Sequence, residues 1–416
     1  PLIIRGARQV GKTWIMKTFG QQYFEKTAYV NFDNNARMKQ VFEGDLDIER
    51  LVLSISAETG VSIEAENTLI IFDEVQEVPK ALTSLKYFYE NAPQYAIVAA
   101  GSLLGVALHQ GTSFPVGKVD FLDLYPLNFR EFLCAMGEKQ FVSMLDSCDT
   151  QMVTVFKTKY IERLREYYFV GGMPEVVKDF SEKKDYNRVR AIQKNLINYY
   201  QQDFSKHAEI KLVPRLNLVW NSIPMQLAKE NKKYIYGQVR EGSRAKDFEL
   251  AIQWLLDCGL IHKVQRIQKP DLPLKAYIDF DAFKLFLVDI GLLIAMTDLD
   301  AKVIIEGNKI FTEFKGALTE QYILQQLISD VGVIPYYYST QNSKGEIDFL
   351  VQGKTSVIPI EVKAEENLKA KSLKAFCEKY QPSYAVRTSM SDYREQDWMT
   401  NIPLYAVKWI KNYVNQ

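Results

Sequence analysis

The sequence predicts an α/β protein of several domains, on three observations. The chain has 416 residues, which is more than one hydrophobic core ordinarily supports. Its first hundred residues hold short apolar runs separated by polar or amphipathic stretches of helical length, and that alternation is typical of a parallel sheet covered by helices. Its composition, with 47% hydrophobic and 25% charged residues, matches that of folded globular proteins.

The apolar runs of the first part predict the strands of the parallel sheet, at residues 2–5, 27–32, 68–72 and 96–100. From about residue 129 to about residue 206, apolar residues recur at three- and four-residue spacing, which indicates helices. The sequence Gly171-Gly172-Met173-Pro174 interrupts them, because these residues force a turn. We expect a core domain over residues 1–135 and a helical lid over residues 136–208.

A winged helix is expected over residues 209–305. Ser243 is a suitable N-cap for an amphipathic helix over residues 244–258, and Gly259 ends it. A strand over residues 260–267, a proline-containing turn over residues 269–273 and a strand near residues 276–280 would form the wing. From about residue 311 onward, a helix, two or three strands, a helix and a final strand predict a further α/β domain over residues 306–416.

Charge and cysteine content exclude several classes of protein. Lys plus Arg equals Asp plus Glu at 51 each, so the whole chain lacks the positive field of a dedicated nucleic-acid binder. The four scattered cysteines form no C-x-x-C pair, which disfavours a zinc site or a disulfide framework and favours the reducing cytoplasm.

The most apolar run, residues 95–108, is too short to span a membrane, and no membrane partner is expected. Because the chain begins with Pro1 rather than Met, we expect the native N-terminus to be trimmed.

A phosphate-binding loop directly follows the first predicted strand. Residues 6–13 fit the pattern G-x-x-x-x-G-K-[ST] without exception and precede a helical run. Glycines let backbone N–H groups wrap phosphates at a helix N-terminus, where the helix dipole also attracts anions. Lys12 is expected on the β- and γ-phosphates, and Thr13 on Mg²⁺. The predicted ATP-binding residues are Gly6, Ala7, Arg8, Gln9, Val10, Gly11, Lys12 and Thr13.

Asp73 and Glu74 close the third predicted strand. Its apolar residues are expected to lie buried beside the loop, so that Asp73 reaches the metal and Glu74 the attacking water. A merely solvated Asp-Glu pair is the alternative. Ser102 follows the fourth strand, where it would sense the γ-phosphate or serve only as a turn or N-cap residue. An arginine finger is also expected in such a site, and the sequence does not decide between Arg130 and Lys118 near a subunit edge.

These motifs resemble a known family. Residues 5–13, 72–76, 100–102 and 124–132 are similar to those of the prokaryotic AAA family ATPases, often called archaeal-type ATPases, that have a C-terminal domain of unknown function. The resemblance covers nearly the whole chain, including the turn at residues 171–174 and the sequence Asp289-Ile290-Gly291-Leu292. It implies a P-loop ATPase core of the AAA type. Relatives have Gly-Arg where this chain has Gly117-Lys118, so an arginine role at that position is left open.

A set of charged residues near the C-terminus predicts a second site. Asp348 and Glu361 fall on two adjacent apolar strands, and Lys363 shares a face with Glu361 because side chains alternate along a strand. Two carboxylates there would bind Mg²⁺, and the lysine would orient or deprotonate a water. This spacing resembles the PD-(D/E)xK nuclease core of the restriction-endonuclease-like fold, in which Glu320 matches an acidic residue of the first helix. Solvated strand-end charges, or a nuclease-like fold used only for binding, are the alternatives.

Two functions therefore remain. In the first, ATP hydrolysis drives DNA or RNA binding or processing through the winged helix and the nuclease-like domain; residues 229–269 have nine basic and five acidic residues, which allows local phosphate contacts. In the second, ATP binding controls a homo-oligomer or a protein partner, and the C-terminal domain only makes contacts. Both require ATP and Mg²⁺ at the first site.

Overall fold

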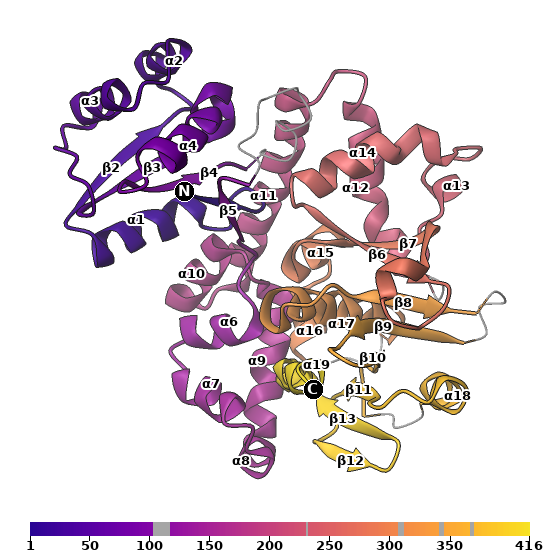
Figure 1. Cartoon of the computed structure of the whole chain (residues 1–416). Coiled ribbons are helices and arrows are strands. Elements are labelled where there is room, and N and C mark those ends of the chain that lie inside the picture. The colour runs from indigo at the N-terminus through magenta and orange to yellow at the C-terminus, as the bar shows by residue number, and fades with distance from the viewer. Residues whose placement is uncertain (103–116, 230–231, 307–311, 341–344, 367–369) are drawn as a thin grey trace. The chain divides into compact units, whose positions relative to one another are not determined.

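The structure, a computed structural model, describes residues 1–102, 117–229, 232–306, 312–340, 345–366 and 370–416 (Figure 1). The chain divides into two compact units. Unit 1 comprises residues 1–125 and 253–260, and unit 2 comprises residues 126–252 and 261–416. Four domains were expected from the sequence, and this division is coarser. The helices expected to form a lid lie in unit 2.

Unit 1 is a parallel sheet with helices on both faces, as the alternating apolar runs predict (Figure 1). The strand order is β2-β3-β4-β1-β5, with every neighbouring pair parallel. Its elements are β1 (Leu2–Arg5), α1 (Lys12–Tyr23), β2 (Lys26–Asn31), α2 (Ala36–Glu43), α3 (Ile48–Thr59), β3 (Thr68–Asp73), the 3₁₀ turn η1 (Val75–Glu77), α4 (Pro79–Asn91), β4 (Ala96–Ala100) and β5 (Asp120–Asp123).

Strand β4 pairs with both β1 and β3 and lies between them. All residues of β3 are buried, since a central strand is covered on both faces. One face packs on a large core that includes Phe32, Phe42 and Phe72, whose rings meet edge to face. The other face packs on α1. Because the strands are parallel, their carboxyl ends share one edge, where ligands bind in open α/β sheets.

Unit 2 joins a set of helices to a mixed sheet (Figure 1). Its helices are α6 (Phe129–Ala135), α7 (Lys139–Asp146), α8 (Thr150–Val155), α9 (Lys157–Val170), α10 (Pro174–Lys183), α11 (Tyr186–His207), α12 (Val213–Leu227), α13 (Tyr236–Val239), α15 (Ile290–Met296), α16 (Ala301–Ile305), α17 (Thr312–Gln326), α18 (Lys371–Tyr380) and α19 (Ile410–Val414). Shorter helical turns are η2 (Leu274–Tyr277), η4 (Leu327–Val331) and η5 (Leu404–Trp409). Helix α14 (Ala245–Asp257) has residues in both units.

The eight strands of unit 2 run in the order β12-β13-β11-β10-β9-β8-β6-β7. They are β6 (Ile261–Ile267), β7 (Ile278–Leu287), β8 (Tyr336–Ser339), β9 (Glu346–Gln352), β10 (Val357–Val362), β11 (Val386–Ser389), β12 (Arg394–Gln396) and β13 (Met399–Pro403). The hairpin of β6 and β7 was expected as a separate wing. It is instead part of this sheet, because β6 pairs in parallel with β8. The second strand is also longer than expected and ends at Leu287.

Three sequence motifs meet in the core of unit 2. Asp289 is fully buried and accepts hydrogen bonds from the backbone N–H groups of Leu292 (3.0 Å) and Gly172 (2.6 Å). The Gly172 carbonyl in turn accepts from the Leu127 N–H at 2.7 Å. A Cβ atom on Gly171 would lie 2.3 Å from the Asp289 carboxylate, and Gly171 has a φ of +75°. The glycines at 171 and 172 are therefore required by close backbone approach.

Helix α17 provides the other polar contacts of this core through buried glutamines. Gln321 binds both backbone groups of Leu287, at 3.0 and 2.7 Å. Gln325 accepts from the Ile290 N–H at 3.2 Å and donates to the Tyr167 hydroxyl at 2.9 Å. These bonds satisfy backbone groups at the end of β7, which would otherwise be buried without partners.

No helix in the described part of the chain combines the length and the apolar character needed to span a bilayer.

Candidate functional site

The loop between β1 and α1 has the backbone of an anion site. Gly6 and Gly11 have φ angles of +138° and +96°, and a Cβ on Gly6 would lie 2.1 Å from the Leu124 carbonyl oxygen. Glycine is therefore needed at both positions. Helix α1 begins at Lys12, and its N-cap residue, Gly11, has no side chain that could cap the N-terminal N–H groups. Those groups are left to bind a ligand, for which the helix dipole favours a negative charge.

Lys12 lies inside this loop. Its ammonium group donates to the carbonyl oxygens of Gly6 at 2.9 Å and of Ala7 at 2.7 Å, and the side chain is 7% exposed. Burial lowers the pKa of Lys12 to about 8, against the opposing charges of Glu74 and Asp73. The two carbonyl groups offer the Lys12 ammonium only partial negative charges, whereas a phosphate group in the loop would offer it a full one.

Asp73, at the end of β3, meets Thr13 of α1, although β4 lies between β3 and β1, the strand that precedes the loop. The Thr13 hydroxyl donates to Asp73 Oδ2 at 2.6 Å, and the backbone N–H of Glu74 donates to Oδ1 at 3.1 Å. Asp73 is 3% exposed. A hydroxyl and a carboxylate oxygen are ligands that suit Mg²⁺, which usually takes one or two protein oxygens and completes its shell with water and phosphate. The predicted pair fits a magnesium ion.

Glu74 lies next to this pair in a left-handed backbone conformation, with φ 51° and ψ 44°. Its Oε2 accepts from Gln76 Nε2 at 2.6 Å and from the Ser102 hydroxyl at 3.3 Å. Ser102 is buried at the end of β4, so the predicted acidic and sensor residues are in contact. Gln76 and Tyr29, whose hydroxyl donates to Asp73 Oδ2 at 2.9 Å, were missed by sequence reasoning. Gln76 closes the segment 72–76 that carries the family resemblance, but no role was assigned to it.

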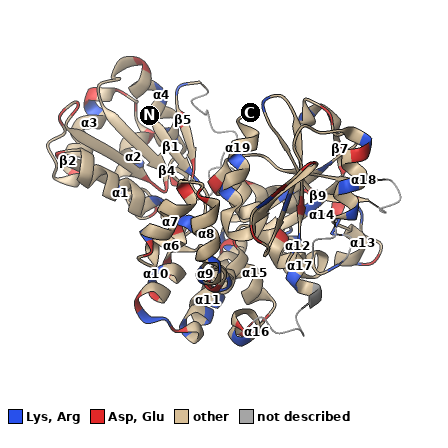
Figure 2. Ribbon diagram, turned by 90° about the horizontal axis from the view of Figure 1, so that it is seen from below, with Lys and Arg blue, Asp and Glu red and all other residues tan. Residues whose placement is uncertain are grey.

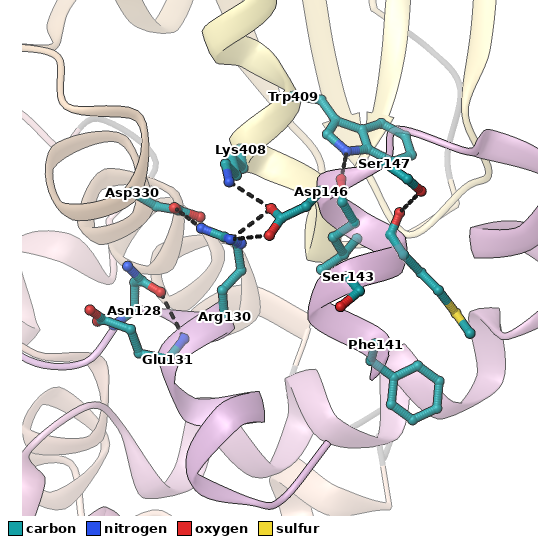
Figure 3. Close-up of polar contacts among 12 residues, drawn as sticks. Asn128, Arg130, Glu131, Phe141, Ser143, Asp146, Ser147, Asp330, Lys408 and Trp409 are labelled. Carbon is teal, nitrogen blue, oxygen red and sulfur yellow. Dashed lines mark hydrogen bonds and ion pairs between the residues drawn. The ribbon is translucent and has the colours of Figure 1, made fainter. Parts of the chain in front are cut away.

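Both candidates for the arginine finger are engaged within their own units. Lys118 pairs with Glu90 at 3.2 Å and lies over the Tyr89 ring. Arg130 lies between Asp330 at 3.0 Å and Asp146, which also binds Lys408 (Figure 3). The Trp409 indole donates to the Leu145 carbonyl beside them. This network connects α6, α7, η4 and η5, so Arg130 has a structural role in unit 2.

The predicted C-terminal residues lie on α17, β9 and the end of β10. By the register of β9 and β10, Asp348 stands opposite Glu361, and both belong to the same face of the sheet. Lys363 pairs with Glu361 at 2.7 Å. Asp348 accepts from the Val362 N–H at 2.7 Å. Burial, and after it the charge of Glu320, raises the pKa of Asp348 to about 7.

Two lysines that sequence reasoning missed lie among these acids. Lys284 of β7 is fully buried and contacts Glu320 at 3.5 Å and, more closely, Glu346. Lys232 contacts the other oxygen of Glu320. Although burial acts to raise it, these ammonium groups hold the pKa of Glu320 below its ordinary value. Within the residues that the structure describes, no group of three or more His, Cys, Asp or Glu side chains is placed to hold a metal.

Three family models match successive parts of the chain. Residues 1–133 match the model described as an AAA domain. Residues 161–303 and 315–407 match two models described as domains of unknown function, DUF8612 and DUF4143. The comparison with curated proteins gave no match.

Two solved structures match the chain at low identity. The Walker-type ATPase PABY2304 of Pyrococcus abyssi is 14% identical, with 71% of this chain and 91% of that chain covered and a TM-score of 0.44. CDC6P from Pyrobaculum aerophilum is 10% identical, with 74% and 88% covered and a TM-score of 0.24.

Proposed function

We propose that this chain binds ATP with Mg²⁺ at residues 6–13 and hydrolyses it. The premise is that residues 1–133, which match the model described as an AAA domain, form an AAA-type ATPase domain. One observation supports this most: Lys12, Thr13 and Asp73 converge at the uncapped N-terminus of α1. A phosphate-binding loop, a hydroxyl and a buried carboxylate are the parts that phosphoryl transfer to water requires.

Each residue then has a role. The N–H groups of the loop and the Lys12 ammonium bind the phosphates and stabilise the charge that develops on them. Thr13 and Asp73 would hold Mg²⁺, which neutralises phosphate charge and orients the nucleotide. Glu74 orients a water and accepts its proton. Ser102, which contacts Glu74, would bring that carboxylate and the γ-phosphate into one hydrogen-bond network.

Replacing Lys12 with alanine should lower ATP turnover by roughly 100-fold or more, because the loop loses the buried ammonium group that is proposed to bind the phosphates. Phosphate release with Mg²⁺ present measures it. The matched control is Lys26→Ala, which removes an exposed ion pair with Glu64 in the same unit and should leave turnover within about twofold. Equal turnover in wild type and Lys12→Ala would show that hydrolysis does not occur in this loop.

A second proposal concerns unit 2: its nuclease-like sheet is a binding module that does not cleave nucleic acid. The ammonium groups of Lys284 and Lys232 lie on Glu320 and also act electrostatically on Asp348, one of the two predicted metal ligands, so they supply positive charge that a divalent cation would otherwise bring. Breaking such pairs leaves buried charges uncompensated, so displacing them by a metal is costly.

The charge pattern of the hairpin agrees with this second proposal. Arg266 pairs with Asp279, and Lys269 pairs with Asp271 at 2.7 Å, so these basic residues of the expected wing already have acidic partners. Blue and red positions are interspersed over the ribbon rather than separated by sign (Figure 2). A protein partner, or a further copy of the chain, therefore suits this unit better than a nucleic-acid backbone.

The absence of cleavage is the expected result of a direct assay. Wild-type protein with Mg²⁺ or Mn²⁺ should leave single- and double-stranded DNA and RNA uncut, in the presence and absence of ATP. Lys363→Ala should behave identically, because the Lys363 ammonium group is paired with Glu361 and is not expected to activate a water. Metal-dependent cleavage by wild type that disappears in Lys363→Ala would restore the nuclease hypothesis.

A further inference from the structure

Tyr29 of β2 contacts the proposed magnesium ligand Asp73 from outside the phosphate loop. Its hydroxyl donates to Asp73 Oδ2 at 2.9 Å, and the Thr13 hydroxyl donates to the same oxygen at 2.6 Å. The two donors come from different elements, because Thr13 is in the first turn of α1 and Tyr29 is on the strand beside β3. Asp73 Oδ2 is thus held by two donors from separate elements.

The Tyr29 ring is itself held in place. It packs against the small core between α1 and the sheet, which includes Met16 and Ile71. The Lys17 ammonium lies 3.7 Å from the ring centroid, one helical turn after Thr13. Thr13, Asp73, Tyr29 and Lys17 therefore form a closed set of contacts between the start of α1 and two strands. The ring has little freedom to move the hydroxyl.

We propose that Tyr29 is a positioning residue for Asp73 and sets the affinity of the nucleotide site for Mg²⁺. This inference rests on the proposed function. When Thr13 offers its hydroxyl oxygen to the cation, the contact between Thr13 and Asp73 changes, whereas Tyr29 does not belong to the loop and keeps its bond. The Asp73 carboxylate then retains the orientation in which its other lone pairs face the cation. Partners of this kind commonly change metal affinity about 10- to 100-fold.

The test is Tyr29→Phe, which keeps the ring, its packing and its contact with Lys17 but removes the hydroxyl. Tyr95→Phe is the matched control: it removes a hydroxyl from the same unit, just before the opposite, amino-terminal end of β4, where the ring contacts Phe88. Mn²⁺ affinity is measured by electron paramagnetic resonance with a non-hydrolysable ATP analogue bound. Affinity for a fluorescent ATP in EDTA and the melting temperature are measured alongside.

We expect Tyr29→Phe to weaken Mn²⁺ binding about 10-fold. Its nucleotide affinity in EDTA should stay within about twofold of wild type, and its melting temperature should match that of Tyr95→Phe. A purely structural role would instead change the nucleotide affinity and the melting temperature together with the metal affinity. Unchanged Mn²⁺ affinity in a Tyr29→Phe protein that binds nucleotide would overturn the inference and leave the proposed function intact. A wild-type protein that binds no nucleotide would overturn both.

Discussion

Replacing Glu74 with glutamine should reduce ATP turnover by about 100-fold or more while the nucleotide stays bound. Glutamine has nearly the same shape and can still contact Gln76 and Ser102, so the geometry around it persists. It cannot accept a proton from the attacking water. The residues proposed to bind phosphate and metal, Lys12, Thr13 and Asp73, are untouched by the change.

Single-turnover hydrolysis and equilibrium binding of a labelled ATP separate the two effects. The matched control is Glu77→Gln, three residues further along the chain, where the Glu77 carboxylate lies 3.9 Å from the Lys39 ammonium group. It should hydrolyse ATP within about twofold of wild type. If Glu74→Gln turned ATP over at the wild-type rate, Glu74 would have no part in activating water.

The second large effect is on stability. Replacing Asp289 with alanine should destabilise unit 2 by about 3 to 5 kcal/mol, because the Gly172 and Leu292 N–H groups would be left buried without their acceptor. Burial raises the pKa of Asp289 to about 6, against hydrogen bonds that act to lower it. A carboxyl group whose folded-state pKa exceeds its unfolded value stabilises most when protonated. Its contribution therefore declines as the pH rises through 6, and the loss in Asp289→Ala should be larger at pH 5 than at pH 8.

Urea unfolding, followed through the buried tryptophans of unit 2 such as Trp220 and Trp409, measures this loss. Asp300→Ala is the matched control, since Asp300 is also a helix N-cap but is exposed, with its side chain accepting from the Lys302 N–H at 2.8 Å. It should cost about 1 kcal/mol. Equal losses in the two variants would mean that burial of Asp289 has no special importance.

The local parts of the nucleotide site could be predicted because each depends on a few adjacent residues. A glycine-lysine-threonine loop after a strand and an Asp-Glu pair after another are read directly from the chain. The insertion of β4 between β1 and β3 could not be read in this way, because strand order depends on contacts distant in sequence. Tyr29 was missed for the same reason: it contacts Asp73 only once β2 lies beside β3.

In unit 2, fewer of the contacts around the predicted site could be predicted from the sequence. The spacing of Glu361 and Lys363 predicts a shared face, and the two side chains do pair. The same spacing says nothing about Lys284, which comes from a hairpin assigned to a different domain and reaches Glu320 only because β6 joins β8. A hydrophobic pattern predicts that β6 and β7 are strands, and edge pairing decides which sheet they join. The hypothesis of an active metal site was therefore made without Lys284 and Lys232, whose positive charges lie on Glu320.

The central claim is that the loop of residues 6–13 binds a triphosphate whose metal and water are managed by Asp73 and Glu74. A crystal structure with Mg²⁺ and a non-hydrolysable ATP analogue tests it most directly. The account predicts phosphate density within the loop, with the Lys12 ammonium moved from the Gly6 and Ala7 carbonyl groups to phosphate oxygens and the cation beside Thr13 and Asp73. An empty loop with Lys12 still on those carbonyl groups, at saturating nucleotide, would contradict it.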